Sequence, residues 1–291
     1  MINLMCIPKL NLSCFSVLVV LLLLSHSLNA EDRTEKLTFL ATIELSASTN
    51  PEAIATSGEA YYHYIYREDK SPIWKGLYIQ SGFQFLLNPA YVKTGLHLEW
   101  MPIALFQLRI QYDYFRYFGQ FTSLLDFDSA EARYGDSEIN AKKGSELTGY
   151  ANRLSIHPVL RVKFGKIIIR NSFDYYKYQI SEERPYFLES AIDILVTRNG
   201  RIYSNMLAAL YTMNITWAKQ SMVGPAYEYT RSIETDLTRQ RIGLVAFQSL
   251  NYSSKRMSNI RWFSKLAYNL EDRNRENEFY IGIGIGTDIN L

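Results

Sequence analysis

Hydrophobic and polar side chains alternate along most of the chain. In "FQLRIQYDYFRYF", residues 106–118, the even positions from Phe106 to Tyr114 are apolar or aromatic, and the odd positions from Gln107 to Asp113 are polar or charged. An alternation of period two predicts a β-strand with one apolar and one polar face. At ~3.3 Å per residue and a tilt of ~45°, this stretch would cover ~30 Å, the thickness of the hydrocarbon core of a bilayer.

The same alternation recurs between polar links and turn residues. It is found in residues 77–87, 96–100, 160–164, 167–175, 188–196, 260–270 and 279–291. The fold predicted from it is all-β, an antiparallel transmembrane β-barrel. The candidate strands add up to an odd number, whereas single-chain bacterial barrels have an even number, so we predict about 12 strands, within about 10 to 14. Segment 37–46 then lies outside the wall, or segment 119–128 hides a further strand.

Two hairpins allow a pairing register to be predicted from the pattern. Residues 91–101 can pair with residues 105–118 so that Trp100 faces Phe106, and the same register places apolar groups opposite apolar groups along the whole hairpin. On the polar face this register brings Lys93 opposite Asp113 and His97 opposite Arg109.

The second hairpin turns at Gly165, which stands at the first central position of a two-residue turn, as type II′ geometry requires. The register that follows sets Arg161 opposite Arg170 and His157 opposite Asp174. Two arginines directly opposite each other are destabilising by a few tenths of a kcal/mol or more. A dry core would raise that cost much further, so the pair favours a wet, polar interior.

The N-terminal stretch has the layout of a secretory signal. Lys9 precedes an apolar run at 15–24, and a polar stretch ending at Ala30 follows it; cleavage is predicted after Ala30. The run is short for a spanning helix, which needs ~20 apolar residues, although an uncleaved anchor is the alternative. We therefore divide the chain into a signal peptide, residues 1–30, and one barrel domain, residues 31–291. Cys6 and Cys14 both lie in the signal, so the mature chain would contain no disulfide, no Cys-ligated zinc and no Cys nucleophile.

The composition argues against nucleic acid as a partner and for a membrane. The formal net charge is only +2, which gives no basic stripe for nucleic acid. Aromatic residues form 14% of the chain and include 22 Tyr. They gather where strands meet loops, in residues 61–66, 113–118, 173–178 and 227–229. Tyr and Trp prefer the membrane–water interface, so these clusters predict the aromatic girdles of a membrane barrel.

The last segment, "EFYIGIGIGTDINL", carries a family resemblance. Its alternate hydrophobic residues run to the end of the chain, and in this it resembles Gram-negative outer-membrane β-barrel proteins of the porin-like kind. The resemblance implies the bacterial outer membrane as location, outer-membrane lipids as surroundings, and recognition of the last strand by the barrel-assembly machinery. Two positions depart from the pattern, because Leu291 replaces the usual aromatic residue and Thr287 interrupts the series. Gly282, Gly284 and Gly286 lie within a strand and predict a close approach inside the barrel, not a nucleotide loop.

The polar face predicts a charged lumen. We expect eight residues to line it: His97, Glu99, Arg109, Asp113, Arg161, Lys163, Arg170 and Asp174. A charged lining can set ion selectivity, and it can equally fill the lumen with salt bridges. The expected function is that of a non-enzymatic barrel, porin-like or a narrow channel of unspecified substrate, with no catalytic, metal or cofactor site and no cofactor. The oligomeric state does not follow from the sequence.

Several alternatives stay open. An outer-membrane lipid-processing enzyme of the phospholipase or deacylase type would need a serine beside a histidine, but the residues two positions after the mature histidines are Ile65, Glu99 and Val159. His97 with Glu99 could form an acid–base pair, although a lumen charge network explains both. A structural or adhesion barrel would act through the longest link, residues 119–149, where Asp126, Asp128 and Glu131 could bind Ca²⁺ or form a solvated acidic loop. A soluble secreted β-protein is the alternative to a membrane barrel.

Overall fold

The computed structural model describes residues 37–49, 51–252, 254 and 257–289. The predicted signal peptide, residues 1–30, and the terminal Leu291 lie outside these residues. The elements are β1 (Leu37–Thr49), β2 (Ala53–Arg67), β3 (Leu77–Leu87), β4 (Tyr91–Ile103), β5 (Phe106–Phe118), β6 (Asp126–Phe127), α2 (Asp136–Ala141), β7 (Thr148–Phe164), β8 (Ile167–Ile180), β9 (Tyr186–Glu189), β10 (Ile194–Thr197), β11 (Arg201–Met213), β12 (Ala218–Ser232), β13 (Leu237–Leu250), β14 (Met257–Asp272) and β15 (Phe279–Ile289). Among the described residues, no helix is both long and apolar enough to cross a membrane.

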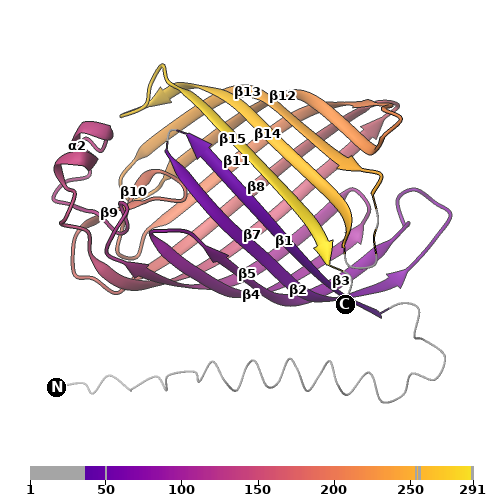
Figure 1. Cartoon of the computed structure of the whole chain (residues 1–291), viewed down its shortest axis with the longest axis horizontal. Coiled ribbons are helices and arrows are strands. Elements are labelled where there is room, and N and C mark those ends of the chain that lie inside the picture. The colour runs from indigo at the N-terminus through magenta and orange to yellow at the C-terminus, as the bar shows by residue number, and fades with distance from the viewer. Residues whose placement is uncertain (1–36, 50, 253, 255–256, 290–291) are drawn as a thin grey trace, which may run out of the picture. The chain divides into compact units, whose positions relative to one another are not determined.

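Twelve of these strands form one closed antiparallel barrel (Figure 1). Each strand pairs with its neighbours around the wall, and β1 closes the cylinder against β15, with Ala41 opposite Ile289 and Thr49 opposite Ile281. The even strand number predicted from the sequence is therefore confirmed. β6, β9 and β10 stand apart from the wall as a small three-stranded sheet in the order β10-β9-β6.

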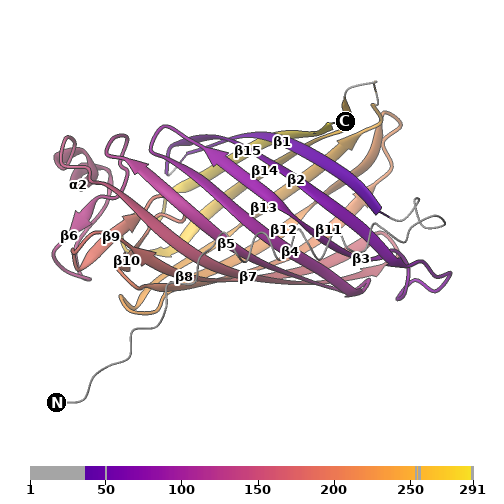
Figure 2. The same cartoon turned by 90° about the horizontal axis from the view of Figure 1, so that it is seen from below.

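The two ends of the barrel differ in their connections. The loop end carries the long connections 119–147 and 181–200, which contain α2, β6, β9 and β10 (Figures 1 and 2). The terminal end, where β1 begins and β15 ends, has two-residue turns at 104–105 and 165–166. The longest described link at the terminal end, 68–76, is still much shorter than the two long connections of the loop end. Bacterial outer-membrane barrels place short turns in the periplasm and long loops outside, so we expect the loop end to face the exterior.

The outward face is apolar on every wall strand. On β5 the exposed positions are Ile110, Tyr112 and Tyr114, while Gln111 and Asp113 between them are buried. On β15 the side chains of Ile281, Ile283 and Ile285 are 47%, 55% and 53% exposed. An apolar surface that extends around a whole barrel is far larger than the patches of soluble proteins and requires lipid around it. The alternative of a soluble secreted β-protein is therefore wrong. The location of the chain in the bacterial outer membrane, as expected for this fold, is confirmed.

The aromatic clusters divide between the two faces. Stacked outward-facing rings join Phe173 to Tyr203 at 6.2 Å and Tyr203 to Tyr229 at 5.8 Å, as a girdle at the membrane interface would. In contrast, the side chains of Phe115, Tyr117 and Tyr178 point inward and are almost fully buried. The prediction of girdles is thus only part of the explanation for the aromatic residues, since the inward ones belong to an internal core.

One predicted register is confirmed and the other is wrong. Across the β7–β8 turn, Phe164 pairs with Ile167 and Arg161 with Arg170, and Gly165 has the expected positive φ of 58°. Across β4–β5, however, Trp100 pairs with Leu108 and not with Phe106.

The shift arises from an irregularity between Trp100 and Ile103, where Met101 and Pro102 interrupt the ladder. Proline has no N–H to give to a ladder and is confined to such irregular positions within sheets. Consequently His97 lies opposite Gln111 and Lys93 opposite Phe115, and the predicted pairs His97–Arg109 and Lys93–Asp113 are not formed across the strands.

Two segments have a different place from the one predicted. Segment 37–46 is part of the wall strand β1, and 119–128 contributes only the short β6. The surplus candidate is 188–196, which forms parts of β9 and β10 instead of a wall strand. Leu188, Glu189, Ile194 and Val196 are all buried, so this hairpin is covered on both faces, which a strand in the barrel wall is not.

A matched pair of glycine variants tests how closely neighbouring strands approach inside the wall. A Cβ at Gly243 would meet the fixed backbone of β14, at 2.6 Å from Ala267 Cα and close to Leu266 O. The three atoms nearest to a Cβ at Gly284 all belong to the ring of Phe263, a side chain that is 37% exposed and has more room to shift than backbone. We expect Gly243→Ala to lower the free energy of unfolding by ~1–3 kcal/mol and Gly284→Ala to cost distinctly less. Urea unfolding of the barrel in lipid vesicles measures both, and equal losses would contradict the explanation.

Candidate functional site

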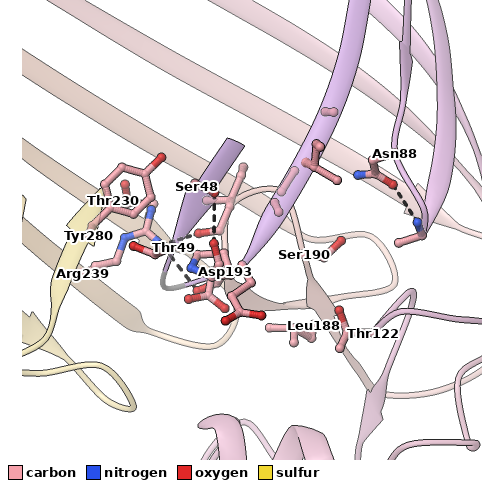
Figure 3. Close-up of a pocket in the computed structure, with 18 of the residues that line it drawn as sticks. Ser48, Thr49, Asn88, Thr122, Leu188, Ser190, Asp193, Thr230, Arg239 and Tyr280 are labelled. Carbon is pink, nitrogen blue, oxygen red and sulfur yellow. Dashed lines mark hydrogen bonds between the residues drawn. The ribbon is translucent and has the colours of Figure 1, made fainter. Parts of the chain in front are cut away.

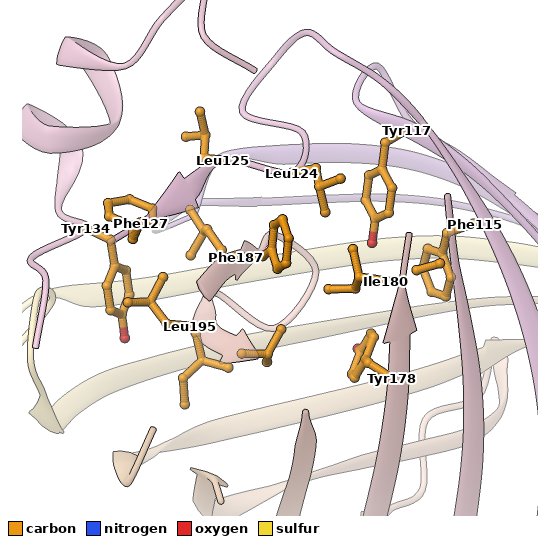
Figure 4. Close-up of a cluster of buried hydrophobic side chains, with 14 of the residues drawn as sticks. Phe115, Tyr117, Leu124, Leu125, Phe127, Tyr134, Tyr178, Ile180, Phe187 and Leu195 are labelled. Atoms are coloured by element: carbon orange, nitrogen blue, oxygen red, sulfur yellow. The ribbon is translucent and has the colours of Figure 1, made fainter. Parts of the chain in front are cut away.

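The mouth of the barrel at the loop end is filled by an apolar core (Figure 4). Inward-facing rings of the wall, Phe115, Tyr117 and Tyr178, pack with Phe187 and Leu195 of the β9–β10 hairpin. The 119–147 connection adds buried side chains: Leu124, Leu125, Phe127 and Tyr134. Burying one such side chain stabilises the packed state by ~1.5–3 kcal/mol. We call the segments 119–147 and 181–200 together the plug, because their side chains pack against the inside of the wall.

Polar contacts anchor the plug to the wall and its turns. Arg275 Nε donates to Asp193 Oδ2 at 2.5 Å, and Arg275 Nη1 donates to Asp136 Oδ1 at 3.0 Å. The side chains of Arg275 and Asp193 are only 3% and 2% exposed. Thr235 Oγ1 also donates to Leu195 O at 3.1 Å, and Arg239 Nη1 donates to Ile192 O. The hairpin is thus held by a buried ion pair as well as by apolar packing.

A cavity of about 890 Å³ lies beside the plug (Figure 3). Ser48, Thr49 and Asn88 line it near the loop end, and Asp193 borders it from the plug. Lys265, in the middle of β14, lines its deep part. The cavity therefore runs from the rim at the loop end to the middle of the lumen, between the plug and the wall.

A charge cluster lies at the deep part of this cavity. Glu228 on β12 pairs with Lys265, with Arg239 at 3.5 Å and with Arg241 at 3.9 Å. Arg241 Nε also donates to Asn269 Oδ1 at 2.6 Å. Sequence reasoning missed Glu228, Arg239 and Arg241, although the spacing of two between the arginines was a signal that both share one face of a strand.

Three of the predicted lumen residues, Glu99, Arg109 and Asp113, belong to one network on β2–β7, in which Gln84 accepts from Arg109 Nη2 and donates to Asp113 Oδ1, each at 2.8 Å. Arg109 pairs with Glu59 at 2.6 Å and with Glu99 at 3.8 Å. Asp113 is fully buried and pairs with Arg153 at 2.8 Å. His97 is also buried, and neither of its ring nitrogens has a hydrogen-bond partner among the described residues.

This network uses the acidic groups that an enzyme would need. Glu99 Oε1 accepts a 2.5 Å hydrogen bond from Tyr78 Oη and lies near Arg109, whereas His97 has no bond to it. The arrangement favours a lumen charge network over a His97–Glu99 acid–base pair.

The other four predicted lumen residues lie on β7 and β8. His157 Nδ1 and Asp174 Oδ1 are 2.7 Å apart, as the predicted register requires. Arg161 and Arg170 are opposite each other and half-buried, and Lys163 is exposed near the turn. Two of the three acidic residues considered for Ca²⁺ in the 119–149 link form ion pairs, since Asp126 lies 3.3 Å from Arg184 and Glu131 lies 3.4 Å from Arg273. Asp128, the third, forms no ion pair with a described residue.

Comparisons with known proteins identify no family for this chain. No family model matches the chain, and no curated protein matches its sequence. Solved structures with a similar fold include the KdgM porin, with 8% identity and a TM-score of 0.39 over 86% of this chain and 99% of that one. An outer membrane channel from Pseudomonas putida F1 has 10% identity and a TM-score of 0.41 over 86% of this chain and 94% of that one. LpxR from Salmonella typhimurium has 8% identity and a TM-score of 0.40 over 87% of this chain and 100% of that one. The predicted outer-membrane barrel is confirmed as a fold by this chain's own closed wall and apolar belt, and no activity is transferred from proteins this distant.

Removal of the buried Arg275–Asp193 pair should destabilise the protein more than removal of an exposed ion pair. Arg275→Gln leaves a buried carboxylate unpaired, so we expect a loss of ~3–5 kcal/mol in the stability of the plug. Arg231→Gln is the matched control, because its pair with Asp236 is exposed and should contribute ~1 kcal/mol or less. Hydrogen–deuterium exchange of residues 186–197 measures the opening of the hairpin. Unchanged exchange in Arg275→Gln would show that apolar packing alone holds the plug.

Glu189 predicts a dependence of plug stability on pH. Burial raises the pKa of its carboxyl above the ordinary value of 4.5, against the opposing effect of the Arg153 charge. The folded state therefore binds more protons than the unfolded state, so the free energy of unfolding falls as pH rises from about 4.5 through the raised pKa.

Glu189→Gln should remove this decrease. The exposed Glu183→Gln, whose side chain is 87% exposed, serves as the control and should retain it. The midpoint of urea unfolding of the refolded barrel, measured at several pH values between about 4.5 and about 8, reports the effect, because the raised carboxyl titrates in this window. Parallel pH curves for the wild type and Glu189→Gln would refute this role of Glu189.

Proposed function

We propose that the protein is a non-enzymatic channel of the bacterial outer membrane, with a narrow passage that runs beside the plug. The observation that carries this proposal is the cavity of about 890 Å³, which extends from the rim at the loop end to the level of Lys265. A barrel of this strand number is intermediate between filled eight-stranded barrels and open porins, so side chains and a plug can restrict it without closing it.

The lining of the passage mixes polar, charged and apolar groups. Ser48, Thr49, Ser172 and Thr230 lie in it together with charged side chains, and large side chains such as Leu86, Phe121 and Tyr280 line it as well. The polar and charged groups could serve small polar solutes. Among the described residues, the connections at the terminal end contribute none to the apolar core of the plug. A solute that passes the plug therefore meets the charged wall of the lumen next. Assembly through recognition of β15 by the barrel-assembly machinery is part of the same proposal.

The two other functions have less support. Adhesion through the 119–149 link conflicts with the burial of Leu124, Leu125, Phe127 and Tyr134, which commits much of this link to the plug. An enzyme would depend on the His157–Asp174 pair, but both residues project from the lumen face and not toward the lipid. Hydrolysis of phospholipid or lipid A vesicles by the refolded protein, with loss of activity in His157→Ala, would overturn the non-enzymatic proposal.

Planar-bilayer recording of the refolded mature chain tests the channel. We expect small conductance steps, and a several-fold increase when residues 183–198 are replaced by a short Gly/Ser linker, because this removes β9 and β10 from the mouth. The matched control replaces residues 70–75 at the terminal end in the same way and should leave the conductance unchanged. Heat-modifiable migration on a gel establishes that each variant has formed a barrel. A folded barrel that lacks the β9–β10 hairpin and remains silent would refute the proposal.

A further inference from the structure

Two guanidinium groups lie side by side on the inner wall of the terminal half. Arg161 on β7 and Arg170 on β8 are direct partners across the hairpin, and both side chains face the lumen. Within the described residues, neither forms an ion pair. Arg161 Nη2 donates to Gln107 Oε1, and Arg170 Nη1 donates to Ser172 Oγ over 3.4 Å. Both of these partners are uncharged.

The flanking strands supply no countercharge. On the β5 side the neighbour is Gln107, and on the β11 side the residue paired with Arg170 is Ala208. The nearest carboxylate along β8, Asp174, lies 2.7 Å from His157. The pair thus differs from Arg109, Arg153 and Lys265, each of which lies against a carboxylate.

The surroundings strengthen any attraction for an anion. Ile168, Ala208 and Leu210 form an apolar section of the inner wall next to Arg170, which lowers the local dielectric constant. Arg161 Nε is shielded and has no hydrogen-bond partner among the described residues. Two like charges in direct register destabilise a sheet unless something compensates them. An oxyanion would relieve the repulsion and accept the unused N–H groups, because guanidinium donors match the geometry of carboxylate and phosphate.

We propose that Arg161 and Arg170 form an oxyanion-binding site in the passage, which makes the channel selective for solutes carrying a carboxylate or phosphate group. The inference rests on the proposed channel for its biological meaning, although binding of the anion itself does not require conduction. The site lies between the deep part of the cavity and the terminal end, so a solute that has passed the plug would meet it before leaving the lumen.

Ion selectivity in planar bilayers is the first test. Under a KCl gradient the reversal potential of the wild type should indicate a preference for anions, and Arg161→Gln/Arg170→Gln should reduce the anion-to-cation permeability ratio several-fold. Lys166→Gln, in the adjacent turn and outside the site, is the control and should retain the wild-type ratio. A double variant that conducts with unchanged selectivity would overturn the inference while leaving the channel itself intact.

Binding measured without a channel readout separates the two proposals. Calorimetric titration of inorganic phosphate and of acetate into the refolded protein in detergent should show binding that weakens by about tenfold or more in the double Gln variant, because the charged hydrogen bonds to the anion are lost. Arg161→Lys/Arg170→Lys keeps the charge and should retain selectivity, but it should lose phosphate affinity because the fork of donors is gone. Binding by a silent barrel would support the site and refute the channel. Equal affinity in the wild type and the double Gln variant would refute the site.

Discussion

The pairing of β1 with β15 is the constraint on which the rest of the structure depends. Hydrocarbon offers no hydrogen bonds, and an unpaired backbone group in it costs several kcal/mol, so a sheet in a membrane must close on itself. The ladder from Ala41–Ile289 to Thr49–Ile281 joins the two ends of the chain and removes the last free edges. Once the cylinder is closed, each strand has a lipid face and a lumen face. The alternation of side chains then places apolar groups toward the lipid and polar groups toward the lumen.

Closure also creates an interior that must be filled in some way. At the loop end it is filled by apolar groups, because Phe115, Tyr117 and Tyr178 of the wall meet Phe187 and Leu195 of the plug. In the middle, buried charges are compensated by ion pairs. Asp113 pairs with Arg153, and Glu228 lies against three cations. Toward the terminal end, Arg161 and Arg170 remain together with uncharged partners. The lumen therefore changes in character along its length, from apolar at the loop end to charged toward the terminal end, where the Arg261–Asp288 ion pair and the Arg161–Arg170 pair both lie.

The plug and the cavity beside it share several residues, so the shape of the cavity depends on how the plug packs. Arg239 borders the cavity, approaches Glu228 and donates to the backbone of Ile192 in the hairpin. Asp193 likewise borders the cavity while Arg275 holds it. Any displacement of the β9–β10 hairpin would therefore alter the charge that lines the cavity, since the same groups line the cavity and hold the hairpin. The cavity is a property of the packed plug and not of the wall alone.

The sequence by itself determined the strand faces, the barrel class and the β7–β8 register. Alternation reports the two faces directly, and a two-residue turn at Gly165 fixes Arg161 opposite Arg170 because the turn is local. Tertiary structure alone decided the rest. The irregularity at Pro102 shifts the β4–β5 register, and the burial of 186–197 on both faces removes it from the wall, although its alternation resembles that of a wall strand. The Glu228 cluster joins β12, β13 and β14, so its members meet only when these strands pair. Period two reports which side of a strand a residue occupies, but it carries no information about which distant strand, or which plug, lies against that side.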